Sequence, residues 1–304
     1  MIILHIMALA FTMFAAPTPQ DASTGNVFIP SEEAERNRRG ISFNDEALPH
    51  LFMGYNNKIG WMYNWASDLC GSAYDHTGVW VDYVPMLHSD RSDHVDPWYV
   101  LAIDMYIFAD AIRVRNVDRC ASFGDGNYPI HVLAFNEPDN CEEGKGGACM
   151  SMDAVLWAWY LHIQPLASRY GDRVKLGSPA VTNANDGTDR AGLRFLESFI
   201  RKCYGCKIDF VNVHWYDGAH QIDYFKRYVQ DALGVGNGRP VWITEFGLTS
   251  GSDEEKRRFL AEVLPWLDSQ RDVHRYAYQM TAKGVLVNDD GTGLSNLGNV
   301  YTYV

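Results

Sequence analysis

The 304-residue sequence predicts an α/β fold in which a single domain forms a (β/α)8 TIM barrel. Short apolar strand-like runs alternate with helix-like runs, the order expected of a parallel sheet that closes into a barrel. Hydrophobic residues make up 47% of the chain, enough for one large core, and no segment resembles a linker. Two strand-like runs end on a glutamate, at the strand end where barrel proteins carry their functional side chains.

Residues 1–39 are expected to be a signal peptide and propeptide leader, followed by a catalytic domain over residues 40–304. The leader begins with an apolar stretch that is too short to cross a membrane and stands where a secretory signal would stand, with cleavage near Ala16 or nearer Ala22. A polar stretch then runs into Arg38-Arg39, a dibasic pair that a processing protease could recognise. The alternative is an ordinary pair of surface arginines.

The predicted elements follow one another in β-α order. The strand-like runs include residues 58–65, 81–87, 131–135, 174–180, 210–215, 241–244 and 276–280. The helix-like runs are residues 154–170, 190–202, 222–233 and 254–270. Within the first of these, Trp157, Leu161 and Leu166 share one face of the helix. This order predicts eight parallel strands closed as a barrel. An open doubly wound sheet is the alternative, but neither a GxGxxG fingerprint nor a Walker loop supports its nucleotide-binding version.

Two strand ends place a carboxylic acid at the rim of the predicted sheet. Pro138 stops the strand that leads to Glu137, and Gly247 lies two residues beyond Glu245. Burial and a second acid nearby push the pKa values of two such groups apart. Glycoside hydrolysis needs this difference, because one carboxyl group protonates the leaving oxygen while the other attacks or stabilises the sugar carbon. Either glutamate alone would more often be a solvated strand end, but the two together indicate a glycosidase.

Charge and composition narrow the class of partner. The formal net charge is −12, and no basic patch is interleaved with aromatic residues, which speaks against nucleic acid. A neutral partner fits better. The 9 Trp, 17 Tyr and 14 Phe residues supply ring faces against which sugars pack, although large α/β cores are also rich in aromatic residues.

Six cysteines, an even number, indicate an oxidising compartment. The local pairs Cys141 with Cys149 and Cys203 with Cys206 are favoured, which leaves Cys70 for Cys120. The second local pair could instead be half of a zinc site or a redox motif. Because a zinc site needs two more ligands at matching spacing, we predict no metal ion.

Seven motifs in order resemble those of glycoside hydrolase family 128, the fungal glucanase-like proteins with an alkali-sensitive-linkage-type catalytic domain. The motifs are residues 40–45, 60–65, 84–87, 135–139, 177–181, 209–216 and 242–247, and residues 286–298 resemble the C-terminal pattern of the family. The resemblance implies a (β/α)8 barrel that acts as an endo-β-1,3-glucanase with retention of configuration. It implies Glu137 as the general acid/base and Glu245 as the nucleophile. The leader and the even number of cysteines predict a secreted, extracellular or cell-wall protein. We expect it to need no cofactor, to bind β-glucan as a monomer and to bind neither nucleic acid nor membrane.

The candidate substrate-binding residues lie beside these glutamates or at other strand ends. They are Asn136, Tyr63, Asn64, Trp65, His214, Trp215, Tyr216 and Tyr278. Asn136 would hydrogen-bond the sugar 2-hydroxyl or, equally, serve the turn before Pro138. Because strand residues alternate, at least one residue in each of the groups 63–65 and 214–216 must point into the core. His214 is more often a structural group at such a position, but it could orient the nucleophile.

The connection between Leu87 and His131 is longer than the family pattern. It contains Asp90, Asp93, His94 and Asp96, which have a metal-like composition but not the spacing of a calcium loop, so a solvated loop is expected. Two alternative functions remain open. One is the same mechanism acting on another β-glycan, and the other is a non-hydrolytic protein that binds cell-wall glucan.

Overall fold

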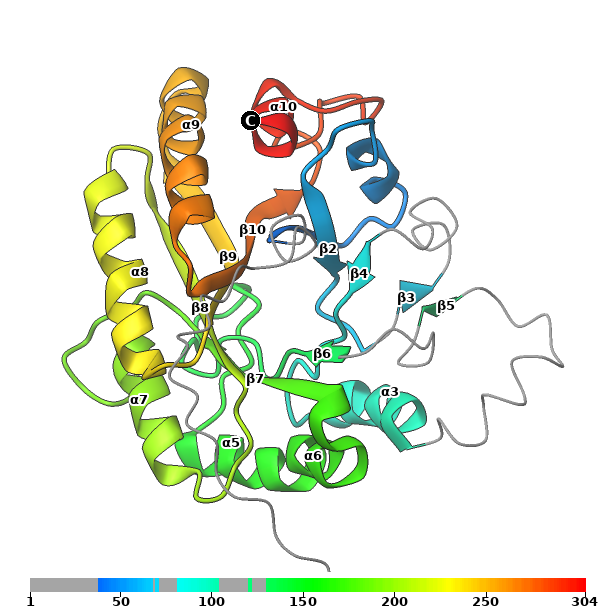
Figure 1. Cartoon of the computed structure of the whole chain (residues 1–304), viewed down its shortest axis with the longest axis vertical. Helices are drawn as coiled ribbons and strands as arrows, with labels where there is room; N and C mark the ends of the chain where they lie inside the picture. The colour runs from blue at the N-terminus through cyan, green and yellow to red at the C-terminus, as the bar shows by residue number, and fades with distance from the viewer. Residues whose placement is uncertain (1–37, 68, 71–80, 104–119, 122–129) are drawn as a thin grey trace, which may run out of the picture.

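The computed structural model describes residues 38–67, 69–70, 81–103, 120–121 and 130–304 (Figure 1). Eight parallel strands form one sheet in the order β4-β2-β1-β10-β9-β8-β7-β6. A bridge between Met86 and Leu133 joins the two end strands, so that the sheet closes on itself. The predicted barrel is therefore confirmed.

The barrel strands are β1 (Arg39–Phe43), β2 (Ile59–Tyr63), β4 (Asp82–Tyr83), β6 (Ile130–Val132), β7 (Val174–Val181), β8 (Phe210–Gly218), β9 (Val241–Ser250) and β10 (Val273–Thr281). The helices are α3 (Ser92–Ile103), α5 (Met152–Ala158), α6 (Gln164–Tyr170), α7 (Gly192–Lys202), α8 (Ile222–Gly236), α9 (Asp253–Ser269) and α10 (Asn296–Tyr303), with short turns η1 (Pro49–Phe52), η3 (Trp159–Ile163) and η4 (Gly171–Arg173). A separate antiparallel pair joins β3 (Leu69–Cys70) and β5 (Cys120–Ala121).

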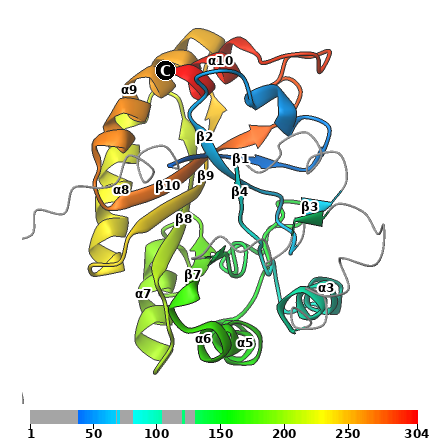
Figure 2. The same cartoon turned by 45° about the vertical axis from the view of Figure 1, so that its right-hand side comes forward.

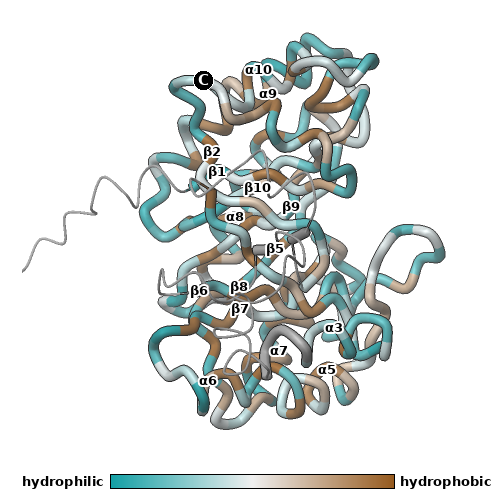
Figure 3. Tube along the Cα trace, turned by 90° about the vertical axis from the view of Figure 1, so that its right-hand side faces the viewer, coloured by the Kyte–Doolittle hydropathy of each residue, from teal (hydrophilic) through white to brown (hydrophobic). Residues whose placement is uncertain are grey.

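Helices α7, α8 and α9 cover the outer face of the strands β7 to β10 (Figures 1 and 2). The buried ring of Trp215 on β8 stacks on Phe259 of α9 and contacts Phe225 of α8 at a centroid distance of 5.0 Å. Ser252 caps α9 in a reciprocal capping box with Glu255. Hydrophobic segments lie along the strands and also along the helices around them (Figure 3). The ring contacts of Trp215 join β8 to α8 and α9.

The predicted helix over residues 154–170 is present but is interrupted by a π-helical turn, η3. The face expected from apolar spacing is wrong for two of its three members: Trp157 is 71% exposed and Leu161 is 47% exposed, while Leu166 is buried. The π turn adds a residue per turn and rotates Leu161 and the residues after it. Trp157 precedes this turn, and the buried positions beside it are Val155 and Ala158. The buried face instead carries Trp159, whose ring packs against Phe199 of α7.

The expected cleavage point between Arg39 and Gly40 lies inside β1, not before the folded domain. Arg39 is 2% exposed, and its Nη1 donates to the carbonyl oxygens of Tyr301 at 2.6 Å and Val304 at 3.0 Å. A protease would have to remove β1 from its pairing with β2 and β10 to reach this bond. Arg38 and Arg39 thus belong to the described fold, while cleavage after residue 39 stays a prediction.

The acidic segment after Leu87 is the start of a helix and not the expected loop. Helix α3 begins at Ser92 and includes Asp93 and His94 in its first turn. Asp93 pairs with Arg91 at the surface, and Nδ1 of His94 lies 2.6 Å from Oγ of Ser89. These contacts occupy two of the four side chains that gave the segment its metal-like composition.

Two of the expected disulfides, Cys141–Cys149 and Cys203–Cys206, are present. The β3–β5 pairing places the backbone of Cys70 opposite that of Cys120, but their side chains lie outside the described part of the chain, so this pair stays a prediction. Among the described helices, none combines the length and the apolar character needed to cross a bilayer.

Candidate active site

Glu137 follows β6 in a left-handed backbone conformation, with φ of 43°. Its N–H donates to the carbonyl oxygen of Ala180 at 2.8 Å, which holds this turn against β7. The carboxylate is almost buried and has two side-chain donors. Oε1 lies 2.8 Å from Nδ1 of His214, and Oε2 accepts a hydrogen bond from Nδ2 of Asn140 at 2.7 Å. Both oxygens of Glu137 are thus held in fixed directions.

Glu245 lies in the middle of β9, which continues to Ser250. One of its oxygens, Oε1, accepts hydrogen bonds from Nε1 of Trp65 at 2.7 Å and from the hydroxyl of Tyr63 at 3.3 Å. The other, Oε2, accepts from the hydroxyl of Tyr216. Trp65 also has a left-handed backbone, with φ of 58°. Non-glycine residues in this conformation cluster at functional sites, and two of the five among the described residues, Trp65 and Glu137, lie at the carboxylate pair.

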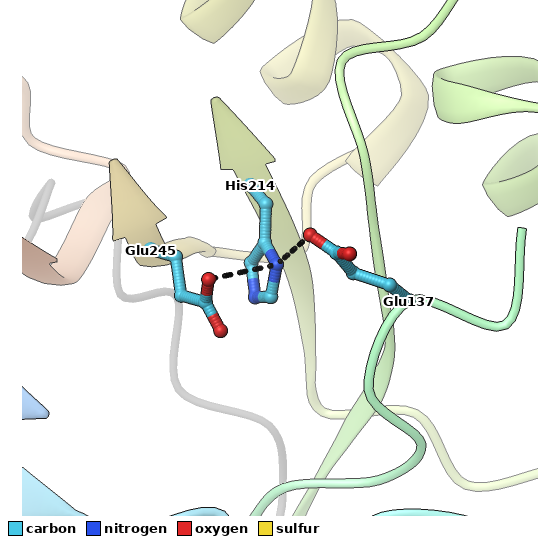
Figure 4. Close-up of side chains that lie close together, drawn as sticks. All are labelled: Glu137, His214 and Glu245. Carbon is cyan, nitrogen blue, oxygen red and sulfur yellow. Dashed lines mark hydrogen bonds and ion pairs between the residues drawn. The ribbon is translucent and has the colours of Figure 1, made fainter. Parts of the chain in front are cut away.

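His214 on β8 lies between the two glutamates (Figure 4). Its Nδ1 is 2.8 Å from Oε1 of Glu137 and 3.6 Å from Oε2 of Glu245, while Nε2 is 2.9 Å from Oγ1 of Thr244. One oxygen of Glu137 also lies within 4.8 Å of one oxygen of Glu245. The imidazole therefore connects the two acids directly.

The same contacts shift the pKa values of the site. Burial alone would raise the pKa of Glu137, but the hydrogen bonds from His214 and Asn140 lower it overall. Burial would lower the pKa of His214, but the negative charges of Glu245 and Glu137 raise it overall. Burial and the charge of Glu245 raise the pKa values of Tyr63 and Tyr216 well above their usual range. The site thus favours a proton on His214, a charged Glu137 and two tyrosines that stay hydrogen-bond donors.

Four of the predicted substrate-binding residues lie against the glutamates: Tyr63, Trp65, His214 and Tyr216. Alternation along β8 explains the last two, since His214 and Tyr216 face the barrel interior while Trp215 between them faces the helices.

Three predicted residues lie elsewhere. Trp215 is fully buried in the helix layer. Tyr278 is 2% exposed, with its ring edge-on to Phe246 at 5.2 Å. Oδ1 of Asn64 accepts hydrogen bonds from the hydroxyl of Tyr83 and from the N–H of Ala66. Trp215 and Tyr278 are thus buried packing residues in this structure, while contact of Asn64, which is partly exposed, with sugar stays a prediction.

Asn136 is buried and faces the loop after Glu137. Its side-chain Nδ2 donates to the backbone carbonyl oxygen of Gly146 at 3.1 Å. The backbone carbonyl oxygen of Asn136 accepts from the N–H of Ala148 at 2.7 Å. Its Oδ1 has no hydrogen-bond partner among the described residues. The turn role of Asn136 is thus visible, while contact with a sugar hydroxyl stays a prediction.

Sequence reasoning missed Asn140 and Thr244. The tight turn in which the N–H of Asn140 donates to the carbonyl oxygen of Glu137 brings this side chain back to the carboxylate. An Asn three residues after a rim glutamate is a usable signal, because Asn favours turns. Thr244 directly precedes Glu245, yet its hydroxyl lies 2.9 Å from Nε2 of His214 on the neighbouring strand. That contact depends on strand register and has no local signal.

Glu137, His214 and Glu245 form the one group of described residues whose geometry could hold a metal ion. Each of their ligand atoms already has a hydrogen-bond partner from the chain, including the indole N–H of Trp65 and the hydroxyl of Tyr216. A metal ion would have to displace these donors, so the donor set fits carboxylates that are held by hydrogen bonds.

Comparisons with known proteins show the family to which the chain belongs. A family model described as glycosyl hydrolase catalytic core matches residues 40–301. The chain is 26% identical over 288 residues to alkali-sensitive linkage protein 1 of Schizosaccharomyces pombe, a match that covers 87% of this chain and 44% of that protein. This chain thus spans less than half the length of that relative.

Solved structures show the same architecture. A curdlan-specific exo-β-1,3-glucanase of Blastomyces gilchristii, from subgroup III of glycoside hydrolase family 128, has a TM-score of 0.67 and 33% identity, covering 89% of this chain and all of that one. A subgroup I endo-β-1,3-glucanase of Amycolatopsis mediterranei, in complex with laminarihexaose, has a TM-score of 0.61 and 25% identity, covering 87% and 98%. A subgroup VII oligosaccharide-binding protein of Cryptococcus neoformans shares the fold, with a TM-score of 0.59 and 19% identity over 88% and 93% of the two chains.

Proposed function

Because this chain belongs to glycoside hydrolase family 128, we propose that it hydrolyses internal linkages of β-1,3-glucan with retention of configuration. The observation that carries the proposal is the short separation of the two carboxylates, with one oxygen of Glu137 within 4.8 Å of one oxygen of Glu245. Retaining glycosidases hold these groups about 5–5.5 Å apart, whereas inverting ones leave about 6.5–9.5 Å for a water molecule. The geometry supports direct attack by a carboxylate.

In the proposed mechanism, Glu245 attacks the anomeric carbon while Glu137 protonates the leaving oxygen. The donors Trp65, Tyr63 and Tyr216 hold the nucleophile in position. Glu137 must carry a proton in this step, and His214 holds one 2.8 Å away, along a hydrogen bond that can deliver it. In the second step Glu137 takes a proton from water, and the resulting hydroxide releases the sugar from Glu245.

The first test is Glu245→Gln, which keeps the shape of the side chain and removes the nucleophilic charge. We expect normal melting and hydrolysis of laminarin below about a thousandth of wild type, a barrier increase of about 4 kcal/mol. Glu262→Gln is the matched control, because Glu262 is half-exposed on α9 and pairs with Lys226 at the surface. Unchanged turnover in Glu245→Gln would remove the assignment.

A second test separates the acid from the nucleophile. Glu137→Ala should lose glucan cleavage but retain the first step on an activated aryl glycoside, whose leaving group hardly needs a proton. Azide should then rescue turnover as a β-glycosyl azide. The same rescue of Glu245→Ala should give the opposite anomer, because azide would replace the nucleophile itself. Reversed anomers would exchange the two roles, and no rescue of either variant would contradict the two-glutamate scheme.

Exo-acting cleavage is the second candidate, favoured by the 33% identity to an exo-β-1,3-glucanase. Product sizes distinguish the two modes. Internal cleavage of laminarin releases a spread of oligosaccharides from the start, whereas exo cleavage releases one small product. Lichenan, cellulose and xylan in parallel reactions test whether the same mechanism serves another β-glycan.

A binding protein without hydrolysis is the remaining alternative, since an oligosaccharide-binding protein shares the fold. The presence of both glutamates, each with ordered hydrogen-bond donors, supports hydrolysis over binding alone. Binding of laminarin oligosaccharides by the wild-type protein with no product after prolonged incubation would support the binding function.

A further inference from the structure

A short loop closed by a disulfide follows Glu137. The Cys141–Cys149 bond joins its two ends. The loop returns to the strand end through two backbone hydrogen bonds, from the N–H of Ala148 to Asn136 at 2.7 Å and from the N–H of Met150 to Pro138 at 2.9 Å. The tip, in contrast, is exposed to solvent. The base of the loop is therefore fixed to the residues on either side of Glu137.

The loop base also fits closely around Asn140. A Cβ atom at Gly147 would lie 2.3 Å from the carbonyl oxygen of Asn140, so the two backbone segments pack with no space for a side chain. On the other side, Nδ2 of Asn140 donates to Oε2 of Glu137 at 2.7 Å. Asn140 is thus held between the disulfide-closed loop and the carboxylate.

We propose that Asn140 is a positioning residue for Glu137 and that the Cys141–Cys149 disulfide holds it in place. The inference rests on the proposed function, in which Glu137 is the acid/base. With Oε2 bonded to Asn140 and Oε1 facing His214, the carboxyl plane is fixed in one orientation. Fixed orientation of an acid matters because a displacement of about 1 Å can cost a hundredfold in rate.

Several polar and titratable groups face Glu137 and affect its protonation. His214 on β8 and Asn140 donate hydrogen bonds to it, and His88 on the β4 side lowers its pKa further. The acids Asp139 and Glu245 lie nearby on the adjoining turn and on β9. Among these, Asn140 is the neutral group. Its Nδ2 donates to Glu137, and its Oδ1 accepts from the N–H of Glu142 at 3.1 Å, a contact that Asn140→Asp can keep and Asn140→Ala cannot.

The first measurement is the pKa of Glu137 itself. It comes from the pH dependence of the NMR signal of the Glu137 carboxyl carbon, in protein that is isotope-labelled on glutamate. The signal is assigned by its absence in Glu137→Gln. The pKa should rise in Asn140→Ala, which loses the donor, and rise further in Asn140→Asp, which keeps the shape and adds a negative charge. The alkaline limb of kcat/KM for laminarin should move to higher pH in the same order, with a loss of about ten- to hundredfold in kcat. A purely structural role would lower activity without this order.

The two disulfides provide a matched comparison. Cys141→Ser/Cys149→Ser should shift the pKa of Glu137 in the same direction as Asn140→Ala, whereas Cys203→Ser/Cys206→Ser, at the end of α7, should leave it unchanged. An unchanged pKa of Glu137 in Asn140→Ala would overturn the proposal, as would equal shifts in the two cysteine variants. If the first cysteine variant does not fold, the Asn140 variants decide. The carbon signal needs no turnover, so it remains informative if wild type fails to hydrolyse glucan.

Discussion

His214 determines where the proton of the site resides. Its ring is fully buried, with Nδ1 within reach of both carboxylates and Nε2 beside the hydroxyl of Thr244. A buried imidazole would ordinarily stay neutral, yet the negative charges of Glu245 and Glu137 raise its pKa. The positive charge of His214 thus partly balances the negative charges of Glu137 and Glu245. Protonation of the site is therefore linked to the stability of the fold.

This linkage predicts a pH-dependent effect of His214→Gln on melting. The raised pKa of His214 contributes stability that is fully present below its unfolded pKa of about 6.5 and is lost as pH rises through the folded value. The lowered pKa of Glu137 contributes stability above its unfolded pKa of about 4.3, which is lost as pH falls through the folded value. The melting temperature of wild type should therefore exceed that of His214→Gln most at about pH 5–6. A difference that stays constant up to about pH 9 would show that the pair does not hold the extra proton.

At the scale of elements, β1 packs directly on the neighbouring strand β2. A Cβ atom at Gly40 would lie 2.1 Å from Cε2 of Trp61, whose ring is fully buried and lies 5.4 Å from that of Trp242. Gly40→Ala should lower the melting temperature by about 2–12 °C, since overpacking costs about 1–3 kcal/mol. The control is Gly234→Ala, whose melting temperature is measured by the same calorimetry.

Gly234 lies in α8 with open space around its Cβ position, so its replacement should raise stability by up to about 1 kcal/mol. If both alanine variants melted alike, close packing of β1 on Trp61 would not limit stability.

The elements differ in how far the sequence predicts them. Strands such as β8 and β9 follow from continuous apolar runs, and the two glutamates follow from the residues that end those runs. The predicted end of the strand at Thr244 is wrong, since β9 extends through Glu245 to Ser250. Gly247 did not end it because the strand pairs on with β8 as far as Gly218. The contact of Thr244 with His214 depends on this register, which local patterns do not encode.

At the scale of the whole molecule, Arg39 joins the first strand to the last helix and to α9. Its guanidinium donates to Tyr301 and Val304, to the hydroxyl of Tyr276, and pairs with Asp268 at 3.3 Å. Arg39→Ala removes the donor to the buried carbonyl oxygen of Tyr301, a loss of about 1–3 kcal/mol. Val304 keeps a donor from Lys58, and Asp268 keeps one from Tyr276. We expect the melting temperature to fall by about 2–12 °C in differential scanning calorimetry.

Arg91→Ala is the control for this prediction, because Arg91 makes an exposed ion pair with Asp93. That replacement should change stability by less than about 1 kcal/mol. Comparable losses in the two variants would mean that the bonds of Arg39 to the end of the chain add little.

The place of β1 between β2 and β10 also has a consequence for synthesis. Arg39 precedes its contact Tyr276 on β10 by 237 residues. At a translation rate of about 5–20 residues per second, β10 is made on the order of ten to fifty seconds after β1. During this time one edge of β1 has no strand to pair with, and unpaired strand edges associate with other chains. The rate of translation therefore sets how long the edge of β1 that pairs with β10 stays unpaired.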